Sequence, residues 1–514
     1  MSFDKFIIAN TDNSDQEWTL TKMILTLYGI MTFTFYLLQF FFAYLNNLRE
    51  KSDDEQAVRL NYINNIPLIN TYGTINSDSN SSIEINFDED TVEVCAVGYQ
   101  EEPELFRKCL QSIKDADYPG LRTTIVIDGN DHERDFAMLN VAKEVFSDRI
   151  KYYNLDHVPD ELPTTIDDKF NGMINFNNEI LNTNTVLCIT QPHRGKRNAM
   201  YTAFCIAKAR KSAYVLNTDS DTVLDTSCLQ NMMRTMKKNP KNGAVAGVLK
   251  LYGPFNWLVK MTAARYRIAF EVERSAQGYW GSVLCVSGPL GLYKLSAVNK
   301  VRDTWVNQHF LGHRCTFGDD RAMSNYLLKE RYEIAMCTTG IAHTEAPDDF
   351  SRFVSQQTRW CRSFWRELFL NLNHVPNKWT WAELCYYGLF PVVLLSTVLA
   401  DDLYRTPTSA LILMITCTIV PLIRITIVGM MFGYQQYDEW YTFYSFMFIL
   451  VLLPIKLFAL VSMNSGGWET SRFAALTNRP VFVVYGWWIF LILGTLHRYY
   501  HGSMVPEVGI GKYI

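Results

Sequence analysis

Two carboxylates separated by one residue could hold a divalent metal ion. Asp219 and Asp221 directly follow the apolar run 213–217, which predicts a strand that ends at this pair. Carboxylate oxygens suit Mg²⁺ or Mn²⁺, and such an ion can bridge the two phosphates of a nucleotide. Taken alone, the pattern also describes a solvated turn. The strand before the pair and the motifs described below favour the metal-site interpretation.

A second acidic residue and a basic cluster could complete a nucleotide site. Asp128 ends another predicted strand, 123–127, where it could bind the base or the ribose, although Asp-Gly is also a common turn. The basic run 193–197 opens a predicted helix. Its Lys196 and Arg197 could bind phosphates with help from the helix N-terminus. In isolation the run also fits a basic surface loop.

Adjacent carboxylates in a Gly-Asp-Asp-Arg motif indicate a general base. The like charges of Asp319 and Asp320 should raise one pKa, which suits a group that removes a proton from a sugar hydroxyl. The alternative is a helix that simply begins with acidic residues. The two interpretations differ in whether the carboxylate faces a substrate.

A Gln-x-x-Arg-Trp motif precedes the apolar end of the chain. Arg359 can neutralise a diphosphate, and Trp360 offers a flat face on which a sugar ring can stack. The surrounding helix is rich in arginine and aromatic residues, so it is also typical of an amphipathic helix at a membrane interface.

The elements that must position these residues alternate between strands and helices. This rhythm predicts a mostly parallel sheet covered by helices on both faces, in which ligands bind beyond the carboxyl ends of the strands. Asp128 and the Asp219/Asp221 pair could therefore share one crevice. The predicted strands are 91–97, 123–127, 185–190 and 213–217, and the predicted helices are 103–115 and 198–209.

Five apolar stretches predict an integral membrane protein in contact with a lipid bilayer. Each is long enough to cross a bilayer or nearly so, and Trp and Tyr gather at their ends. Arg424 and Lys456 are single charges within two of them. The stretches are 23–48, 384–400, 406–437, 440–468 and 480–496. Residues 440–459 could instead form a helix that lies along the interface.

Charge and cysteine usage exclude other classes. The net charge of −4 gives no reason to expect a nucleic-acid partner. The eleven cysteines form no Cys-x-x-Cys pair, so we expect neither a disulfide framework nor a zinc site, and reduced thiols facing the cytosol fit better.

The predicted divisions are a polar leader and membrane helix (1–50), a polar linker (51–90), a catalytic domain (91–350), interfacial helices (351–380) and a membrane block (381–514).

The set and order of the motifs resemble the processive family 2 glycosyltransferases, namely cellulose, chitin and hyaluronan synthases. Longer runs resemble hyaluronan synthases of the eukaryotic and algal-virus type. The resemblance implies a GT-A fold, cytosolic catalysis with UDP-GlcNAc and UDP-GlcA, and extrusion of the nascent polysaccharide through the enzyme's own channel in the plasma membrane. The runs are 98–103, 107–112, 126–129, 191–197, 273–277, 287–291, 310–321 and 356–360.

The resemblance also implies roles at matching positions on the nucleotide side. Tyr99 lies in a matching run and belongs to the substrate site, and Asp128 would contact uracil. Lys196 would bind the nucleotide, with Arg197 beside it. Asp219 and Asp221 would hold UDP together with Mn²⁺ or Mg²⁺, and Asp221 would contact the ion most directly.

On the acceptor side the resemblance assigns Asp320 as the catalytic base and places Cys315 close to the acceptor sugar. Gln356 and Arg359 would face the diphosphate. Trp360 would stack on the end of the acceptor chain.

A gating loop that closes over UDP in the family matches residues 464–473. Trp468, Thr470 and Arg472 are the matching residues, and Glu469 stands where the family usually has glycine.

The family generally starts with two membrane spans, whereas this chain shows one. A channel built from its four or five segments would be minimal, or would need a second copy of the chain.

Two other functions fit parts of the sequence. A chitin or chitin-like synthase would share most motifs but would use UDP-GlcNAc alone. A non-catalytic membrane transporter or scaffold could carry a decayed transferase domain, but the intact acidic and Gln-x-x-Arg-Trp motifs argue against it.

Overall fold

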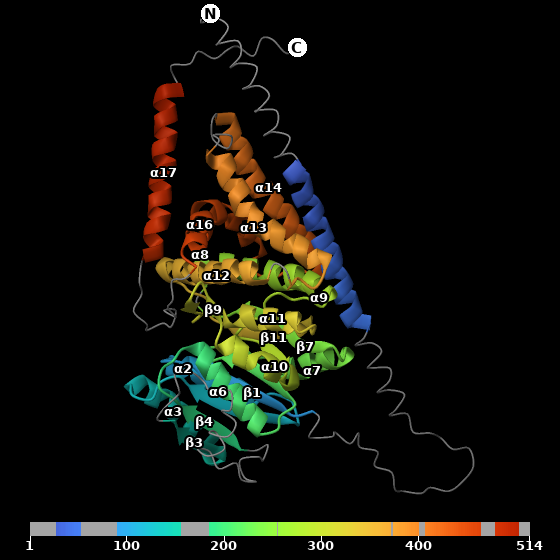
Figure 1. Cartoon of the computed structure of the whole chain (residues 1–514). Coiled ribbons are helices and arrows are strands. Elements are labelled where there is room, and N and C mark those ends of the chain that lie inside the picture. Colours follow the sequence, from blue (N-terminus) through green and yellow to red (C-terminus); the bar gives the residue numbers. More distant parts are fainter. Residues whose placement is uncertain are drawn as a thin grey trace, which may run out of the picture.

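The structure is a computed structural model that describes residues 27–52, 90–155, 185–253, 255–371, 374–399, 407–463 and 479–502. It has three tiers (Figure 1): a sheet domain at one end, a layer of helices in the middle, and long apolar helices at the other end. The predicted gating loop lies outside the described residues, as do most of the predicted leader and linker.

A nine-stranded sheet forms the core of the first tier, in the order β3-β4-β2-β1-β5-β8-β7-β11-β6. Only β8 and β6 run antiparallel to their neighbours, so the prediction of a mostly parallel sheet is confirmed. The strands are β1 (Val92–Gly98), β2 (Leu121–Ile127), β3 (Ile150–Asn154), β4 (Val186–Thr190), β5 (Tyr214–Asp219), β6 (Val223–Leu224), β7 (Asn242–Leu251), β8 (Gly291–Lys294) and β11 (Glu333–Thr344).

The central strand β1 is buried along its whole length, because helices cover both faces of the sheet. Its register aligns Gly98 with Ile127 of β2, and Val97 with Asp219 of β5. The segments that carry Asp128 and Asp219 therefore leave the sheet on either side of β1 at one edge. This is the edge at which the sequence predicts a shared ligand site.

Six helices and a short hairpin surround this sheet. They are α2 (Pro103–Lys114), α3 (Glu133–Phe146), α6 (Lys196–Ala209), α7 (Cys228–Lys238), α10 (Leu295–Val306), α11 (Asp319–Lys329) and the hairpin of β9 (His309–Phe310) and β10 (His313–Arg314). Helix α6 begins at the crevice with the basic cluster, and α11 begins there with the two adjacent carboxylates.

The middle tier consists of two helical segments that lie between the sheet and the apolar helices (Figure 1). One is α12 (Phe350–Asn371), which carries the Gln-x-x-Arg-Trp motif. The other is a continuous helix of α8 (Trp257–Arg267), the π-helical η2 (Ile268–Arg274) and α9 (Ser275–Tyr279). Such π-helical turns are frequent at functional sites, since the additional residue re-aims the side chains around it.

The third tier confirms the prediction of several apolar helices that could span a membrane. Four helices in the described ranges are long and apolar enough, namely Leu27–Ser52, Met414–Phe432, Asp438–Val461 and Pro480–His497. The predicted segment 384–400 lies largely in α13 (Lys378–Leu399), which is not among the four. The tier comprises the N-terminal helix, α13, α14 (Pro407–Phe432), α15 (Tyr441–Met447), η5 (Phe448–Leu452), α16 (Leu453–Val461) and α17 (Arg479–Gly502).

Charged contacts join the middle tier to the apolar helices. Glu273 of η2 pairs with Arg265 at 2.8 Å and with Arg424 of α14 at 3.7 Å. The Gln277 amide of α9 donates to Glu383 of α13 at 3.0 Å. Charges at membrane depth are costly unless they are paired, so these contacts hold the two tiers in one arrangement.

Candidate active site

The loop that enters α6 is held by a buried carboxylate. Asp128 is fully buried, and its Oδ2 accepts the Gly195 N–H at 2.7 Å while Oδ1 accepts the Gln191 amide at 2.8 Å. The imidazole of His193 lies 2.8 Å from Oδ2, and this hydrogen bond raises the His193 pKa. Both carboxylate oxygens have partners. Asp128 therefore holds the loop in this structure, and its direct contact with a base stays a prediction.

An aromatic pair forms one wall of the crevice. The ring of Tyr99 stacks on the ring of His193, with centroids 3.9 Å apart and planes 18° from parallel. The His193 side chain is 44% exposed, so this stack can present a flat surface to a planar ligand. No sequence pattern indicates this pairing, because the two residues lie on separate loops.

Lys196 and Asp219 form an ion pair at the start of α6. Burial lowers the Lys196 pKa, but the charge and hydrogen bond of Asp219 outweigh it and raise that pKa overall. Gly288 packs directly against the pair, since a Cβ at this position would lie 2.9 Å from the Lys196 ammonium. The Asn217 amide fixes the glycine carbonyl at 2.9 Å. A positioning role for Gly288 was missed from the sequence, where it contributed only to the family resemblance.

Arg197 lies where it cannot reach a phosphate. Its side chain is buried, its Nε donates to Asp319 at 2.6 Å, and one terminal nitrogen donates to the Trp305 carbonyl at 3.1 Å. The same nitrogen is 3.1 Å from Gln308 Oε1. This placement corrects the expected phosphate contact: Arg197 joins α6 to the start of α11, and Lys196 alone of the two faces the crevice.

The Asp219/Asp221 pair belongs to a cluster of negative charge. Asp221 is next to Glu101, whose carboxylate accepts from the Ser220 hydroxyl at 3.1 Å. Burial, followed by the charges of Glu101 and Asp219, raises the Asp221 pKa to about 8. A divalent cation would relieve this repulsion, so the donor set fits one.

The protein offers only part of a metal coordination shell. No group of three or more His, Cys, Asp or Glu side chains that could hold an ion occurs within the described ranges. Mg²⁺ is commonly bound by one or two carboxylates together with water and substrate phosphates. Asp221 and Asp219 would therefore hold Mn²⁺ or Mg²⁺ jointly with a nucleotide diphosphate.

Asp320 is an ionised carboxylate at the start of α11. Its Oδ1 accepts the Arg321 backbone N–H at 2.8 Å, and its Oδ2 lies 3.4 Å from the Cys285 thiol. Burial raises the Asp320 pKa, but the Arg321 charge and N–H, followed by the Lys196 charge, outweigh burial and lower it overall. The expectation of a raised pKa was wrong for this residue, because the charges of Arg321 and Lys196 outweigh the effect of burial.

Four buried polar atoms of α12 lack a partner among the described residues, and two of them belong to the Gln-x-x-Arg-Trp motif. These two are Arg359 Nε and Gln356 Oε1. Burial lowers the Arg359 pKa, while Asp320, Asp319 and Asp219 act in the opposite direction, so the guanidinium lies within the field of these carboxylates. An unpaired buried donor is costly. This arrangement fits a site that an anionic ligand completes.

Trp360 and Cys315 lie at the edges of the same region. Trp360 is 37% exposed, and its ring centroid is 6.5 Å from that of Tyr266. Cys315 is buried before α11, where its N–H donates to the Gln308 carbonyl at 2.9 Å. Burial raises the Cys315 pKa, so the group is a neutral thiol. Trp468, Thr470 and Arg472 lie outside the described residues.

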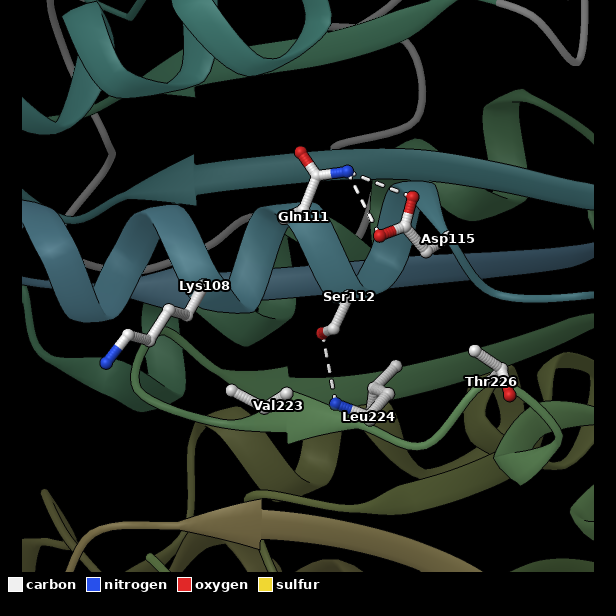
Figure 2. A pocket seen from close by; sticks show the side chains of 7 residues that line it. All are labelled: Lys108, Gln111, Ser112, Asp115, Val223, Leu224 and Thr226. Atoms are coloured by element: carbon white, nitrogen blue, oxygen red, sulfur yellow. Dashed lines mark hydrogen bonds between the residues drawn. The ribbon is translucent and has the colours of Figure 1, made fainter. Parts of the chain in front are cut away.

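A separate cavity of about 350 Å³ lies between α2 and β6 (Figure 2). The Gln111 amide bonds to Asp115 at 2.9 Å beside it, and the Ser112 hydroxyl accepts the Leu224 N–H at 3.0 Å. None of the predicted site residues lines it, so it is not the candidate site. Its lining is Lys108, Gln111, Ser112, Asp115, Val223, Leu224 and Thr226.

Comparisons with known proteins identify relatives of this chain. Residues 151–363 match the family model described as glycosyltransferase like family 2. Hyaluronan synthase 2 of Homo sapiens is 31% identical over 490 residues, which cover 93% of this chain and 83% of that protein. Hyaluronan synthase 3 of Xenopus laevis is 34% identical over 411 residues, covering 79% and 72%.

Among solved structures, a mannosyltransferase from Pyrobaculum calidifontis, PcManGT in complex with GDP-Man and Mn²⁺, matches with a TM-score of 0.45 and 14% identity. The match covers 85% of this chain and 98% of that one.

Gly318 should tolerate no side chain. It caps α11 with a left-handed φ of 75°, and a Cβ there would collide with the Ser363 hydroxyl of α12. We expect Gly318→Ala to lower the free energy of unfolding by about 2–4 kcal/mol, combining backbone strain with overpacking. Thermal unfolding of the purified full-length protein measures this.

Gly486→Ala is the matched control, because no atom lies within 4 Å of the Cβ position there. Combining Gly318→Ala with Ser363→Gly should restore part of the loss by removing the collision. Equal unfolding temperatures for Gly318→Ala and Gly486→Ala would contradict the close packing.

Proposed function

The chain belongs to the hyaluronan synthase family, and from this premise we propose that Asp320, Arg359 and the Asp219/Asp221 pair form the active site at which it polymerises hyaluronan. It is a glycosyltransferase, and relatives over 93% of the chain favour hyaluronan over chitin as the product. The observation that carries the site assignment is the buried, unpaired Arg359 Nε close to an ionised Asp320.

Asp320 serves as the general base. It accepts the proton of the acceptor hydroxyl while that oxygen attacks C1 of the donor sugar, and the bond from C1 to the phosphate oxygen breaks as UDP departs. The attack comes from the face opposite UDP, so the configuration at C1 inverts. A base with a lowered pKa is deprotonated at neutral pH, as the step requires.

Arg359 and Lys196 stabilise the departing diphosphate. Arg359 brings an unpaired buried donor, and Lys196 can transfer its contact from Asp219 to a phosphate oxygen. Preorganised cations of this kind usually supply a large share of the rate enhancement. Mn²⁺ or Mg²⁺, held by Asp221 and Asp219, would add further stabilisation of the leaving group when bound.

The remaining predicted residues bind the nucleotide of the donor and the end of the acceptor chain. The Tyr99–His193 stack supports the uracil ring, and Asp128 positions that loop and can contact the base as it opens. Gln356 adds an acceptor beside the diphosphate, Trp360 stacks on the acceptor terminus, and Cys315 lies beside the acceptor sugar. Trp468, Thr470 and Arg472 are proposed to close over bound UDP.

UDP-GlcNAc and UDP-GlcA are used alternately at this one site, and the protein is an integral membrane protein. We place the catalytic domain in the cytosol at the plasma membrane. Arg49 and Lys51 support this orientation, because they flank Glu50, which accepts the Thr338 N–H of β11 at 3.0 Å, and basic residues favour the cytosolic side. A second copy of the chain is proposed to complete the channel if one set of helices is too small.

The function is tested by supplying the purified protein with each donor alone and with both. We expect long polymer only with UDP-GlcNAc and UDP-GlcA together, consumed in equal amounts, because the product alternates. Radiolabel from each donor in high-molecular-mass product measures this. Unlimited polymer from UDP-GlcNAc alone would instead establish a chitin-like synthase.

Asp320→Asn should abolish polymer synthesis, lowering the rate at least about 100-fold, since an amide cannot accept the proton. UDP affinity should change less than about twofold, because Asp320 does not contact the nucleotide. Asp115→Asn is the control, as that exposed carboxylate caps the end of α2 and none of the described candidate site residues contacts it. Normal synthesis by Asp320→Asn would remove the base assignment.

Arg359→Gln should weaken UDP binding, whereas Arg197→Gln should lower the stability of the fold. The Arg359 Nε is buried without a partner, so loss of this side chain should weaken UDP binding about tenfold or more and leave the unfolding temperature unchanged or higher. Arg197 has several partners, and its loss should lower the unfolding temperature by leaving Asp319 uncompensated. Calorimetry with UDP and thermal unfolding measure the two effects, and the reverse pattern would exchange the two roles.

A further inference from the structure

Two basic side chains, Arg321 and Arg274, lie next to Asp320, and that of Lys456 lies near Arg321 across the Phe364 ring. Arg321 follows Asp320 on α11, and its guanidinium carbon lies 5.6 Å from the ring centroid of Phe364. The Lys456 ammonium of α16 lies 5.9 Å from the same ring. Arg274 of η2 lies close enough to Asp320 and Arg321 to be influenced by both charges. Arg321 therefore lies near both Arg274 and Lys456.

None of these three cations has a carboxylate partner within 4.0 Å in the part of the chain that the structure describes. Arg274 donates to the Ser287 hydroxyl at 2.6 Å and lies over the Phe270 ring at 4.1 Å. Lys456 also lies 5.3 Å from the Phe448 ring. The anionic groups near them are Asp320 and Glu273, and Glu273 is itself paired with Arg265 and Arg424.

Two other buried cations of the middle tier are paired, Arg265 with Glu273 and Arg267 with Asp438. Arg197 of α6 likewise pairs with Asp319. Burying a charge without a partner is costly, and such charges usually pair or bind a ligand. Arg274, Arg321 and Lys456 share Asp320 and a Glu273 that already pairs with Arg265 and Arg424, so positive charge is in excess in this region.

This positive charge is distinct from the diphosphate site. The diphosphate is assigned to Lys196, Arg359 and the acidic pair at the carboxyl ends of the strands. Lys456 instead approaches from α16, which packs on the opposite side of α12 from α11 (Figure 1). A second anionic group, nearer the apolar helices than the phosphates, would match it.

We propose that Arg274, Arg321 and Lys456 form a carboxylate site for the glucuronate unit at the reacting centre. The inference rests on the proposed function, since hyaluronan carries one carboxylate in each disaccharide and a neutral polymer carries none. Guanidinium groups bind carboxylates through paired hydrogen bonds, and Arg321 and Lys456 both lie within about 6 Å of the Phe364 ring, so one carboxylate could be near both. The glucuronate is either the donor sugar or the terminal sugar of the chain.

Lys456→Met tests the site in the full-length enzyme, because methionine keeps the length of the side chain and removes the charge. Enzyme that retains its nascent chain is stalled by withdrawing one donor, and the missing donor is then supplied in a single turnover. Chains that end in GlcA receive GlcNAc, and chains that end in GlcNAc receive GlcA. The two addition rates are measured separately.

A carboxylate site predicts that Lys456→Met slows one addition about tenfold and leaves the other within about twofold, the size expected for a lost charge-assisted hydrogen bond. Selective slowing of GlcA addition identifies the donor as the source of the carboxylate. Selective slowing of GlcNAc addition identifies the chain end. Lys456→Arg should restore the affected rate in either case.

Lys260→Met is the matched control. Lys260 is also partly buried in the middle tier, over the rings of Tyr437 and Trp440 at 5.5 and 5.4 Å, but it lies away from Asp320. Its loss should change neither rate. Equal slowing of both additions by Lys456→Met, or no slowing, would overturn the carboxylate site. Failure of the parent enzyme to use UDP-GlcA would instead overturn the proposed function.

Discussion

Arg197 and Asp319 meet at 2.6 Å in the buried space between α6 and α11. Their pairing neutralises one of two adjacent carboxylates, so Asp320 is left as the charged group that faces the crevice. It also ties the helix that carries Lys196 to the helix that carries the base. A change at either partner would move the nucleotide side and the acceptor side together, because both helices begin at this contact.

The remaining charges divide the site into two zones around Asp320. Glu101, Asp219 and Asp221 make the strand-end zone negative, which suits a cation that accompanies a diphosphate. Arg321 and Lys456 make the zone beneath the apolar helices positive. A charged sugar polymer that leaves toward the membrane would therefore move from a cation-dependent binding zone into one that attracts its own carboxylates.

The sequence predicted the parts of this site that follow from local pattern. Apolar runs that end in acidic residues indicated the strand ends at Asp128 and Asp219, and long apolar stretches indicated the membrane helices. It could not predict the partner of Arg197, which depends on a residue 122 positions away that only packing brings near. The lowered pKa of Asp320 was missed for a similar reason, since it depends partly on Lys196, which only packing brings near.

The π-helical turn η2 explains how one helix serves both the membrane tier and the catalytic tier. Glu273 contacts Arg424 of an apolar helix, whereas the next residue, Arg274, contacts Ser287 below the active site. A π-helical turn accommodates an additional residue and re-aims the side chains that follow it. Glu273 and Arg274 are consecutive residues that contact different tiers. A shift of the apolar helices that moved Glu273 would therefore also move Arg274, which lies beside Asp320. Two consecutive residues of this turn thus link the apolar helices to the region around the base.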